Sequence, residues 1–374
     1  MAQVLHLTGR VLHGPGSGAD EHVTQGLWVL DGRVTTTRPT GDHDVTALDG
    51  WVVPGLVDAH CHIGLGATGE VDPGTAQEQA RTDRDAGTLL VRDAGSPADT
   101  RWVQARDDLP RLVRAGRHVA RTRRYLRGFA EEVEPPQLVD EVRRQARRGD
   151  GWVKVVGDWV DREAGDLAPC WSRADLVAAA AAAHEEGARI TAHVFGAAAL
   201  ADVLAAGFDG VEHATAMGPD EVAVMAAAGT AVVPTLVNIG TFPDIAARGE
   251  GKFPRYAAHM RRLHARRREA VALAHEAGVA LFAGTDAGGT LPHGILADEV
   301  AELARAGLGP AAALDAACWS ARRWLGFPAL EEGASADLLV LPADPREDVA
   351  VLAAPSAVVL RGRQVARGGR RLAH

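Results

Sequence analysis

Between about residue 51 and residue 330, short apolar runs alternate with segments rich in Ala, Arg and Glu. Eight of these runs have the length and character of buried strands: VVPGLVDAHCH, GTLLVRDAG, RHVART, GWVKVVGD, ARITAHVF, GVEHAT, AVVPTL and ALFAGTDAG. The segments between most of them favour helices. The clearest, Ser172 to Gly187, begins with Ser172 and Asp175 in a capping-box pattern. Eight strands that each lead into a helix predict an α/β fold, a (β/α)8 TIM barrel, which can take about 250 residues as one domain.

The two ends of the chain show a different pattern. Residues 1 to about 50 alternate short strand-like runs with Gly and Asp turns, and the tail returns to strands in ADLLVLPAD and AVVLRGRQVARGG. We therefore predict that residues 1–52 and 333–374 form one composite, small β-sandwich domain. The barrel would then take residues 53–332.

Charge and cysteine usage narrow the classes of partner and compartment. The formal net charge of −9 disfavours nucleic acid and an anionic membrane as partners. The longest apolar run, Leu176 to Ala183, is far shorter than the roughly 20 residues that span a bilayer, and the N-terminus lacks a signal-peptide pattern. The scattered Cys61, Cys170 and Cys318 predict a reducing, cytoplasmic location and argue against a disulfide framework or a thiolate zinc site.

Several potential metal ligands stand at the ends of predicted strands, where barrels carry their catalytic groups. The first strand ends in H-x-H, which points His60 and His62 to the same side. The fifth, sixth and eighth strands end with His193, His213 and Asp286. Each could by itself be a histidine satisfied by backbone or an aspartate capping a turn. Together, at the same end of four strands, they indicate a site for Zn²⁺ or a similar divalent ion.

A lysine in an apolar strand adds to this pattern. Of 40 Lys plus Arg residues only two are lysines, Lys154 and Lys252, and Lys154 lies in the predicted fourth strand. Two metals would need a bridging anionic ligand, and a lysine amine can add CO₂ to become a carbamate, whereas a guanidinium stays protonated. The alternative is an ammonium that reaches outward or pairs with Asp158, Glu212 or Asp286.

The motifs VVPGLVDAHCHIG, WVKVV, ITAHVF, VEHAT, VVPTL and AGTDAGG-x-LPHG-x-L-x-x-E resemble those of the amidohydrolase superfamily. The likeness is to its prolidase-like, imidazolonepropionase-related branch with a carboxylated lysine, and it covers nearly the whole chain. The resemblance implies two divalent metal ions, zinc by default, and six ligands: His60, His62, Lys154, His193, His213 and Asp286. The strand-one histidines and Asp286 would hold one ion and the other two histidines the second. The Lys154 carbamate and a hydroxide would bridge them.

The reaction that this resemblance implies is hydrolysis of a carbon–nitrogen bond other than a peptide bond, with dipeptidase activity also possible. The substrate would be a linear or cyclic amide, such as an acyl amino acid or a dipeptide-like molecule. Asp286 would act as the catalytic proton shuttle, passing the proton of the nucleophile to the leaving nitrogen.

The chain departs from the pattern of relatives that cleave dipeptides or acyl amino acids. Those relatives have a tyrosine where this chain has Phe195, and a Gly-Gly-His segment where this chain reads RTRRYLRGFAEEV. Both departures weaken a prolidase or carboxypeptidase assignment. Candidate substrate contacts are Phe195, His293, Tyr125 and Arg124. Tyr125 and Arg124 could equally be surface residues, and His293 could instead support Asp286.

Other functions fit the same residues. A lactonase, esterase or phosphotriesterase could use the same metal centre. A mononuclear deaminase would carry H-x-x-E after the sixth strand, but His213 is followed by Ala214, Thr215 and Ala216. A scaffold that has lost its metals conflicts with a complete ligand set. The predicted partner is a small-molecule substrate. The sequence is also compatible with a homo-oligomer such as a dimer.

Overall fold

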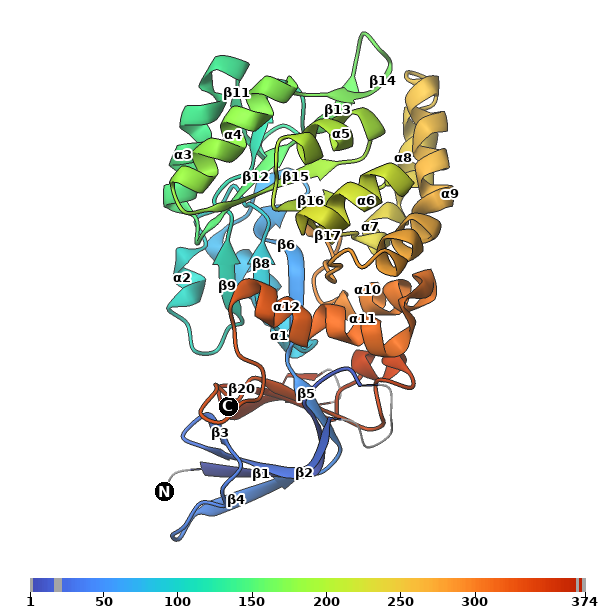
Figure 1. The fold of residues 1–374 in the computed structure, drawn as a ribbon. Coiled ribbons are helices and arrows are strands. Elements are labelled where there is room, and N and C mark those ends of the chain that lie inside the picture. The colour runs from blue at the N-terminus through green and yellow to red at the C-terminus, as the bar shows by residue number, and fades with distance from the viewer. Residues whose placement is uncertain (1–2, 17–21, 368–369, 372–374) are drawn as a thin grey trace.

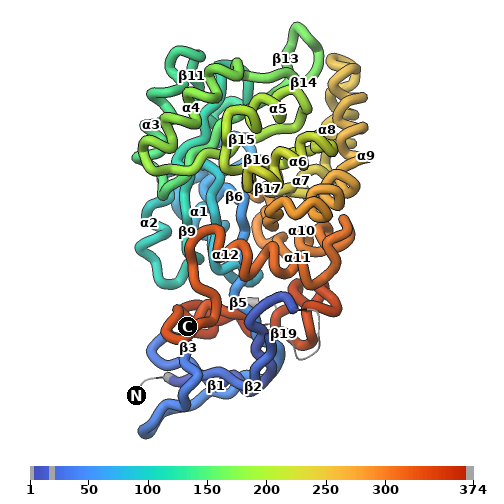
Figure 2. The backbone as a smooth tube through the Cα atoms, in the orientation of Figure 1, coloured from blue at the N-terminus to red at the C-terminus, as the bar shows by residue number. Residues whose placement is uncertain are grey.

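The computed structural model describes residues 3–16, 22–367 and 370–371. One nine-stranded sheet combines both ends of the chain, which lie side by side at the bottom of the molecule (Figures 1 and 2). Its strands in order are β22 (Arg370–Arg371), β21 (Arg363–Arg367), β20 (Ala357–Leu360), β19 (Leu338–Leu341), β5 (Trp51–Pro54), β1 (Gln3–Leu12), β2 (Val23–Leu30) and β3 (Arg33–Thr35), with β4 (Asp44–Leu48) paired to β1. The strands predicted at both ends are therefore present, and they share one sheet.

Two further sheets, built mainly from parallel strands, make up the body of the protein. The first contains, in order, β11 (Glu131–Val133), β10 (Val119–Arg121), β12 (Trp152–Val156), β15 (Arg189–Val194), β16 (Gly210–His213) and β17 (Ala231–Val233). The second contains β18 (Ala287–Gly289), β6 (Leu56–Gly66), β8 (Thr88–Asp93) and β9 (Arg111–Arg114), with β7 (Gly69–Glu70) antiparallel to β6. A separate hairpin joins β13 (Asp158–Asp161) and β14 (Asp166–Pro169).

Helices connect the parallel strands and lie around them in Figure 1. They are α1 (Pro73–Asp85), α2 (Arg101–Gln104), α3 (Leu138–Arg148), α4 (Arg173–Glu185), α5 (Ala197–Ala205), α6 (Pro219–Ala228), α7 (Leu236–Ile239), α8 (Phe242–Gly249), α9 (Pro254–Glu276), α10 (Leu296–Leu303), α11 (Gly309–Ala317) and α12 (Trp319–Leu325). Short helical turns occupy Pro135–Gln137, Ala304–Leu308 and Val349–Ala353. The capping box predicted for Ser172 and Asp175 is present at the start of α4.

All eight predicted strand runs overlap regular strands of the parallel sheets, and two runs differ in detail. VVPGLVDAHCH divides at Gly55 into β5 and β6, which belong to different sheets. ALFAGTDAG is mostly irregular up to β18, although its backbone bonds to strands on both sides. Phe282 N donates to Val232 O at 3.0 Å, and Asp286 N donates to His60 O at 2.7 Å.

The largest apolar core lies between the β12–β17 strands and the helices that cover them, and includes Val155, Ile190 and Val211. This packing fixes where the strands end, and therefore where the groups that follow them meet.

Within the described ranges we find no helix with both the length and the apolar character that crossing a membrane requires.

Gly284 lies where the irregular eighth segment presses against β6. A Cβ added there would stand 2.7 Å from His60 Cβ and 2.8 Å from His60 N, and would also meet Val233 Cγ1. We predict that Gly284→Ala lowers the free energy of unfolding by about 1–3 kcal/mol, because the neighbours cannot yield without moving backbone. Urea unfolding measures this loss.

The matched control is Gly251→Ala, since nothing lies within 4 Å of a Cβ at that exposed position. Equal unfolding midpoints for the two variants would contradict the close approach of the eighth segment to His60.

Candidate metal centre

His60 and His62 turn their Nε2 atoms toward each other at the end of β6. The two atoms are 3.1 Å apart. His60 Nδ1 lies 2.8 Å from Glu212 Oε2, and His62 Nδ1 lies 2.6 Å from the carbonyl oxygen of Gly95. Because a carboxylate and a carbonyl only accept, both Nδ1 atoms carry the proton. In the neutral rings, both Nε2 lone pairs therefore point into the same space.

Asp286 brings a third acceptor to this point. Its Oδ1 lies 3.0 Å from His62 Nε2 and 3.1 Å from His60 Nε2, and the side chain is 19% exposed. Asn238 of α7 donates to Oδ2 at 2.5 Å, which fixes the orientation of the carboxylate. Burial raises the pKa of Asp286, but the adjacent His60 and His62 hold that pKa well below its usual value. Three converging electron-pair donors form an arrangement that a cation would satisfy.

Lys154 places its amine beside the same group. Its Nζ lies 3.5 Å from His60 Nε2, and the residue is buried in β12. Burial lowers the pKa of the Lys154 ammonium. Among the described residues, no carboxylate forms an ion pair with Lys154; the Asp158 carboxylate instead accepts from the backbone of Phe195 and Gly196. The alternative of a lysine paired with a carboxylate therefore lacks its partner.

His193 and His213 form a second pair next to the first. His193 Nδ1 lies 2.9 Å from His213 Nε2, and the His60 and His213 ring centroids are 5.2 Å apart. Burial lowers the pKa of His213 to about 3 and holds the pKa of His193 well below its usual value. Both rings are therefore neutral near pH 7, which is the form that binds a metal.

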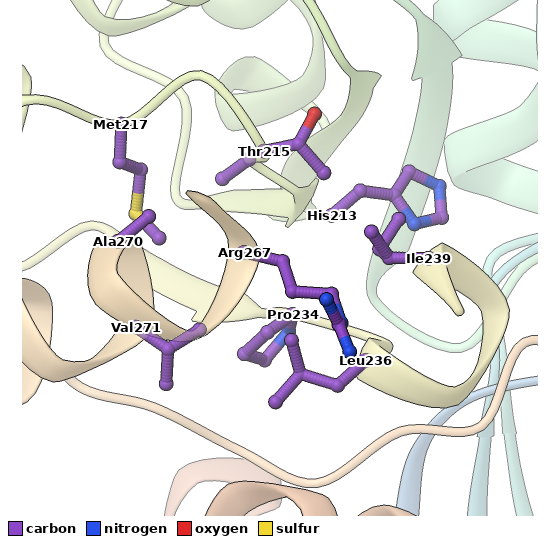
Figure 3. Close-up of a pocket in the computed structure, with 10 residues that line it drawn as sticks. His213, Thr215, Met217, Pro234, Leu236, Ile239, Arg267, Ala270 and Val271 are labelled. Atoms are coloured by element: carbon purple, nitrogen blue, oxygen red, sulfur yellow. The ribbon is translucent and has the colours of Figure 1, made fainter. Parts of the chain in front are cut away.

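Apolar packing contributes to the burial of His213. Figure 3 shows the ring at the edge of a small pocket whose lining includes Leu236, Ile239 and Arg267. On the side of Nδ1, His213 contacts Thr235 Oγ1 at 2.7 Å. The backbones of His213 and Thr235 both have positive φ, 67° and 49°, a costly conformation that the surrounding fold must hold in place.

Glu212 connects the centre to a buried arginine. Arg92 of β8 donates to Glu212 Oε1 at 2.6 Å and to the carbonyl oxygen of Ala59 at 2.7 Å. The Arg92 guanidinium also lies over the rings of Trp152 and Trp324, at 4.6 and 4.9 Å. Sequence reasoning considered Glu212 only as a partner for Lys154 and overlooked Arg92. The signal available was a charged residue directly after a valine in two predicted strands, Arg92 in TLLVRD and Glu212 in GVEH.

Three aromatic rings pack around the ring of His193. Its ring centroid lies 4.3 Å from that of Phe195, 5.5 Å from Tyr125 and 5.6 Å from Trp159. His193 Nε2 is buried and has no hydrogen-bond partner among the described residues. Ring packing, rather than a hydrogen bond at Nε2, therefore orients this histidine.

The four candidate substrate contacts take different positions. Phe195 and Tyr125 pack against His193, as described above. The Arg124 guanidinium is engaged within the protein, at 2.9 Å from Asp161 Oδ2 and 2.9 Å from the carbonyl oxygen of Ala168. His293 bonds to Asp83 Oδ2 at 2.8 Å. Roles of these side chains toward a substrate stay predictions.

His118 is a further histidine that sequence reasoning did not select. It is buried just before β10, with Nδ1 3.2 Å from the carbonyl oxygen of Gly95, which also accepts from His62. Its ring centroid is 5.8 Å from that of His62 and 5.2 Å from that of Tyr125. His118 therefore stands between the first pair of histidines and the aromatic group.

Comparison with known proteins gives the family. Residues 51–365 match the Amidohydrolase family. The chain is 54% identical over 353 residues to an uncharacterized protein of Mycobacterium tuberculosis, across 94% of this chain and 95% of that protein. It is 31% identical over 244 residues to ochratoxinase of Aspergillus niger, across 62% of this chain and 50% of that protein. The chain belongs to the Amidohydrolase family, as its motifs predicted.

Solved structures show the same fold. A Xaa-Pro dipeptidase with bound methionine aligns at a TM-score of 0.80 with 21% identity, covering 97% of this chain and 99% of that chain. The A. niger ochratoxinase aligns at a TM-score of 0.78 with 20% identity, covering 98% of this chain and 96% of that chain. Family membership together with these hydrolase neighbours supports a hydrolase.

Glu212→Gln tests whether the buried carboxylate orients His60. An amide has one oxygen and turns its NH₂ toward the donors of His60 or Arg92, so we expect metal affinity to fall by about 10–100-fold. Competition with a chelator measures the affinity. The control is Glu163→Gln at an exposed position. Unchanged affinity in folded Glu212→Gln protein would contradict the orienting role.

Proposed function

We propose that this protein is a binuclear metal-dependent amidohydrolase that cleaves the carbon–nitrogen bond of a small amide. The observation that carries the proposal is the meeting of His60 Nε2, His62 Nε2 and Asp286 Oδ1 within 3.0–3.1 Å of one another, while the two Nδ1 atoms are held by acceptors. This donor set fits a divalent ion, for which zinc is the default.

We propose that the ligands form two neighbouring metal-binding positions. His60, His62 and Asp286 would hold one ion, and the second pair of histidines would hold the other. Divalent ions bound there would lower the pKa of a water molecule and polarise a carbonyl, which would make hydroxide available near neutral pH.

Lys154 is proposed to carry the anionic bridge between the two positions as a CO₂-derived carbamate. Its position beside His60 Nε2 supports this role, and the absence of a carboxylate partner among the described residues leaves its amine available. Burial lowers the ammonium pKa, which favours the neutral amine that reacts with CO₂.

Asp286 is proposed to move the proton during the reaction. The histidines next to it hold its pKa low, so it begins as an acceptor, and the hydrogen bond from Asn238 fixes the second carboxylate oxygen. It would take the proton of the attacking water and release it to the leaving nitrogen. Tyr125 and Phe195, packed on His193, would line the adjacent substrate space.

Eight of these parallel segments are proposed to form one closed barrel, residues 53–332, beside a terminal β-sandwich domain of residues 1–52 and 333–374. Closure is supported by backbone hydrogen bonds of the irregular eighth segment. The segment donates to Val232 O on one side and to His60 O on the other, where it also accepts from Ala59 N. On the opposite edge, Asp150 N donates to Arg114 O at 2.8 Å, which brings β9 next to the start of β12.

Three unpaired cysteines are compatible with the proposed cytoplasmic location.

Lys154→Arg tests the bridge while keeping the positive charge. A guanidinium cannot form the carbamate, so we expect the metal bound at this centre to fall from about two ions per chain. We expect activity to fall by more than roughly 100-fold, the loss expected when an outer partner of a metal ligand is removed. Elemental analysis and a hydrolysis assay measure the two effects.

Lys252→Ala is the control, because it removes the only other lysine from an exposed position. If Lys154→Arg keeps both its metal and its activity, the bridging role is wrong.

The reaction class is tested by supplying zinc-loaded protein with N-acyl amino acids, dipeptides, cyclic amides and lactones. We expect turnover of at least one amide, abolished by Asp286→Asn. Turnover of lactones or phosphotriesters alone would replace the proposal with an esterase-type function. About one ion per chain at this centre would favour the mononuclear deaminase instead.

A further inference from the structure

A second group of potential metal ligands lies beside the proposed centre and takes no part in it. Cys61, between the two histidines of β6, has its Sγ 3.7 Å from Asp83 Oδ2 of α1 and 3.7 Å from His293 Nδ1. Asp83 Oδ2 and His293 Nδ1 are 2.8 Å apart. The three side chains come from a strand, a helix and the loop after Asp286, and all are at most 5% exposed.

The arrangement is not that of a nucleophilic triad. In a Cys–His–Asp triad the thiol and the carboxylate contact different nitrogens of the imidazole. Here both contact Nδ1 of His293, and Nε2 is buried with no hydrogen-bond partner among the described residues. Three donor atoms facing one point are instead the arrangement of a metal site.

Further negative charge is buried around this group. Asp58 and Asp93 are each 1% exposed, and both act electrostatically on Cys61 and His293. Asp93 Oδ2 is buried with no partner in the described part of the chain, although Oδ1 accepts from the Gly95 amide. Buried anionic groups are costly unless a positive charge compensates them. Arg114 and the nearby histidines act on Asp93, and a bound cation would add to that compensation.

We propose that Cys61, Asp83 and His293 bind a structural divalent metal ion, separate from the catalytic centre. A tetrahedral zinc, with Zn–S of about 2.3 Å and Zn–N or Zn–O of about 2.0–2.1 Å, separates its sulfur ligand from nitrogen or oxygen ligands by roughly 3.5–3.6 Å. Both observed sulfur distances, 3.7 Å, match this separation. The nitrogen and oxygen need only move apart by about half an ångström once the ion displaces the proton between them.

The ion would tie together three elements that shape the catalytic site. Asp83 belongs to α1, Cys61 lies between the two histidines of β6, and His293 follows Asp286 by seven residues. The backbone amide of Gly294 also donates to Asp83 Oδ1 at 2.8 Å, which brings the same loop to α1. The isolated cysteines predicted no thiolate zinc site from spacing, because these partners lie far apart in the sequence.

Cobalt substitution of the full-length protein separates this site from the catalytic one. The catalytic ligands are imidazole and oxygen groups, so a thiolate-to-cobalt charge-transfer band in the near ultraviolet can come only from a cysteine site. We expect metal-free protein reconstituted with Co²⁺ to show this band. Cys61→Ser should lose the band and bind one fewer cobalt ion per chain.

Three controls make the result specific. Cys170→Ser should keep the band, since the Cys170 thiol lies outside this group and donates to the Arg124 carbonyl oxygen at 3.8 Å. Asp83→Asn should weaken the band at limiting cobalt, and it serves as the second test if Cys61→Ser does not fold. His213→Ala should lose catalytic cobalt but keep the band, so failure of the proposed amidohydrolase function leaves this test intact. A wild-type protein that binds cobalt without the band, or a band that persists in Cys61→Ser, overturns the proposal.

Discussion

One buried carboxylate, that of Glu212, holds the core of the centre together. It accepts from Arg92 of β8, from Thr191 of β15 at 2.6 Å and from His60 of β6, and it sits on β16 itself. Four strands therefore share a single acceptor. A carboxylate at 0% exposure is stable only with such partners, so the strands must keep this register for the charge to be tolerated.

The contacts of Glu212 also determine how the histidines of the centre are oriented and protonated. Because His60 Nδ1 donates to Glu212, the Nε2 lone pair points at His62 and Asp286. Burial then lowers the pKa of the second pair of histidines, so those rings are neutral and open to a metal. Arg92 supplies the compensating positive charge, with Trp152 and Trp324 against its guanidinium. The fold thus prepares ligands in the protonation state that metal binding requires.

Sequence reasoning selected the proposed ligands because strand ends carry a simple signal. An H-x-H pair alternates across a strand, and His193, His213 and Asp286 each follow an apolar run. It did not find His118 or Arg92, since a single polar residue in a strand run does not reveal which neighbour it meets. It also missed the division of the first run at Gly55, because two adjacent apolar strands of different sheets read as one.

The sequence by itself determined the strand–helix alternation, the strand character of both ends and the residue types at the strand ends, because these depend on periodicity and composition over short distances. Only the tertiary structure decided which atoms face one another. The tautomer of His60 depends on Glu212, 152 residues away. The meeting of Cys61, Asp83 and His293 depends on how α1 and the last loop pack on β6. Such contacts depend on the packing of distant segments, which local sequence patterns do not record.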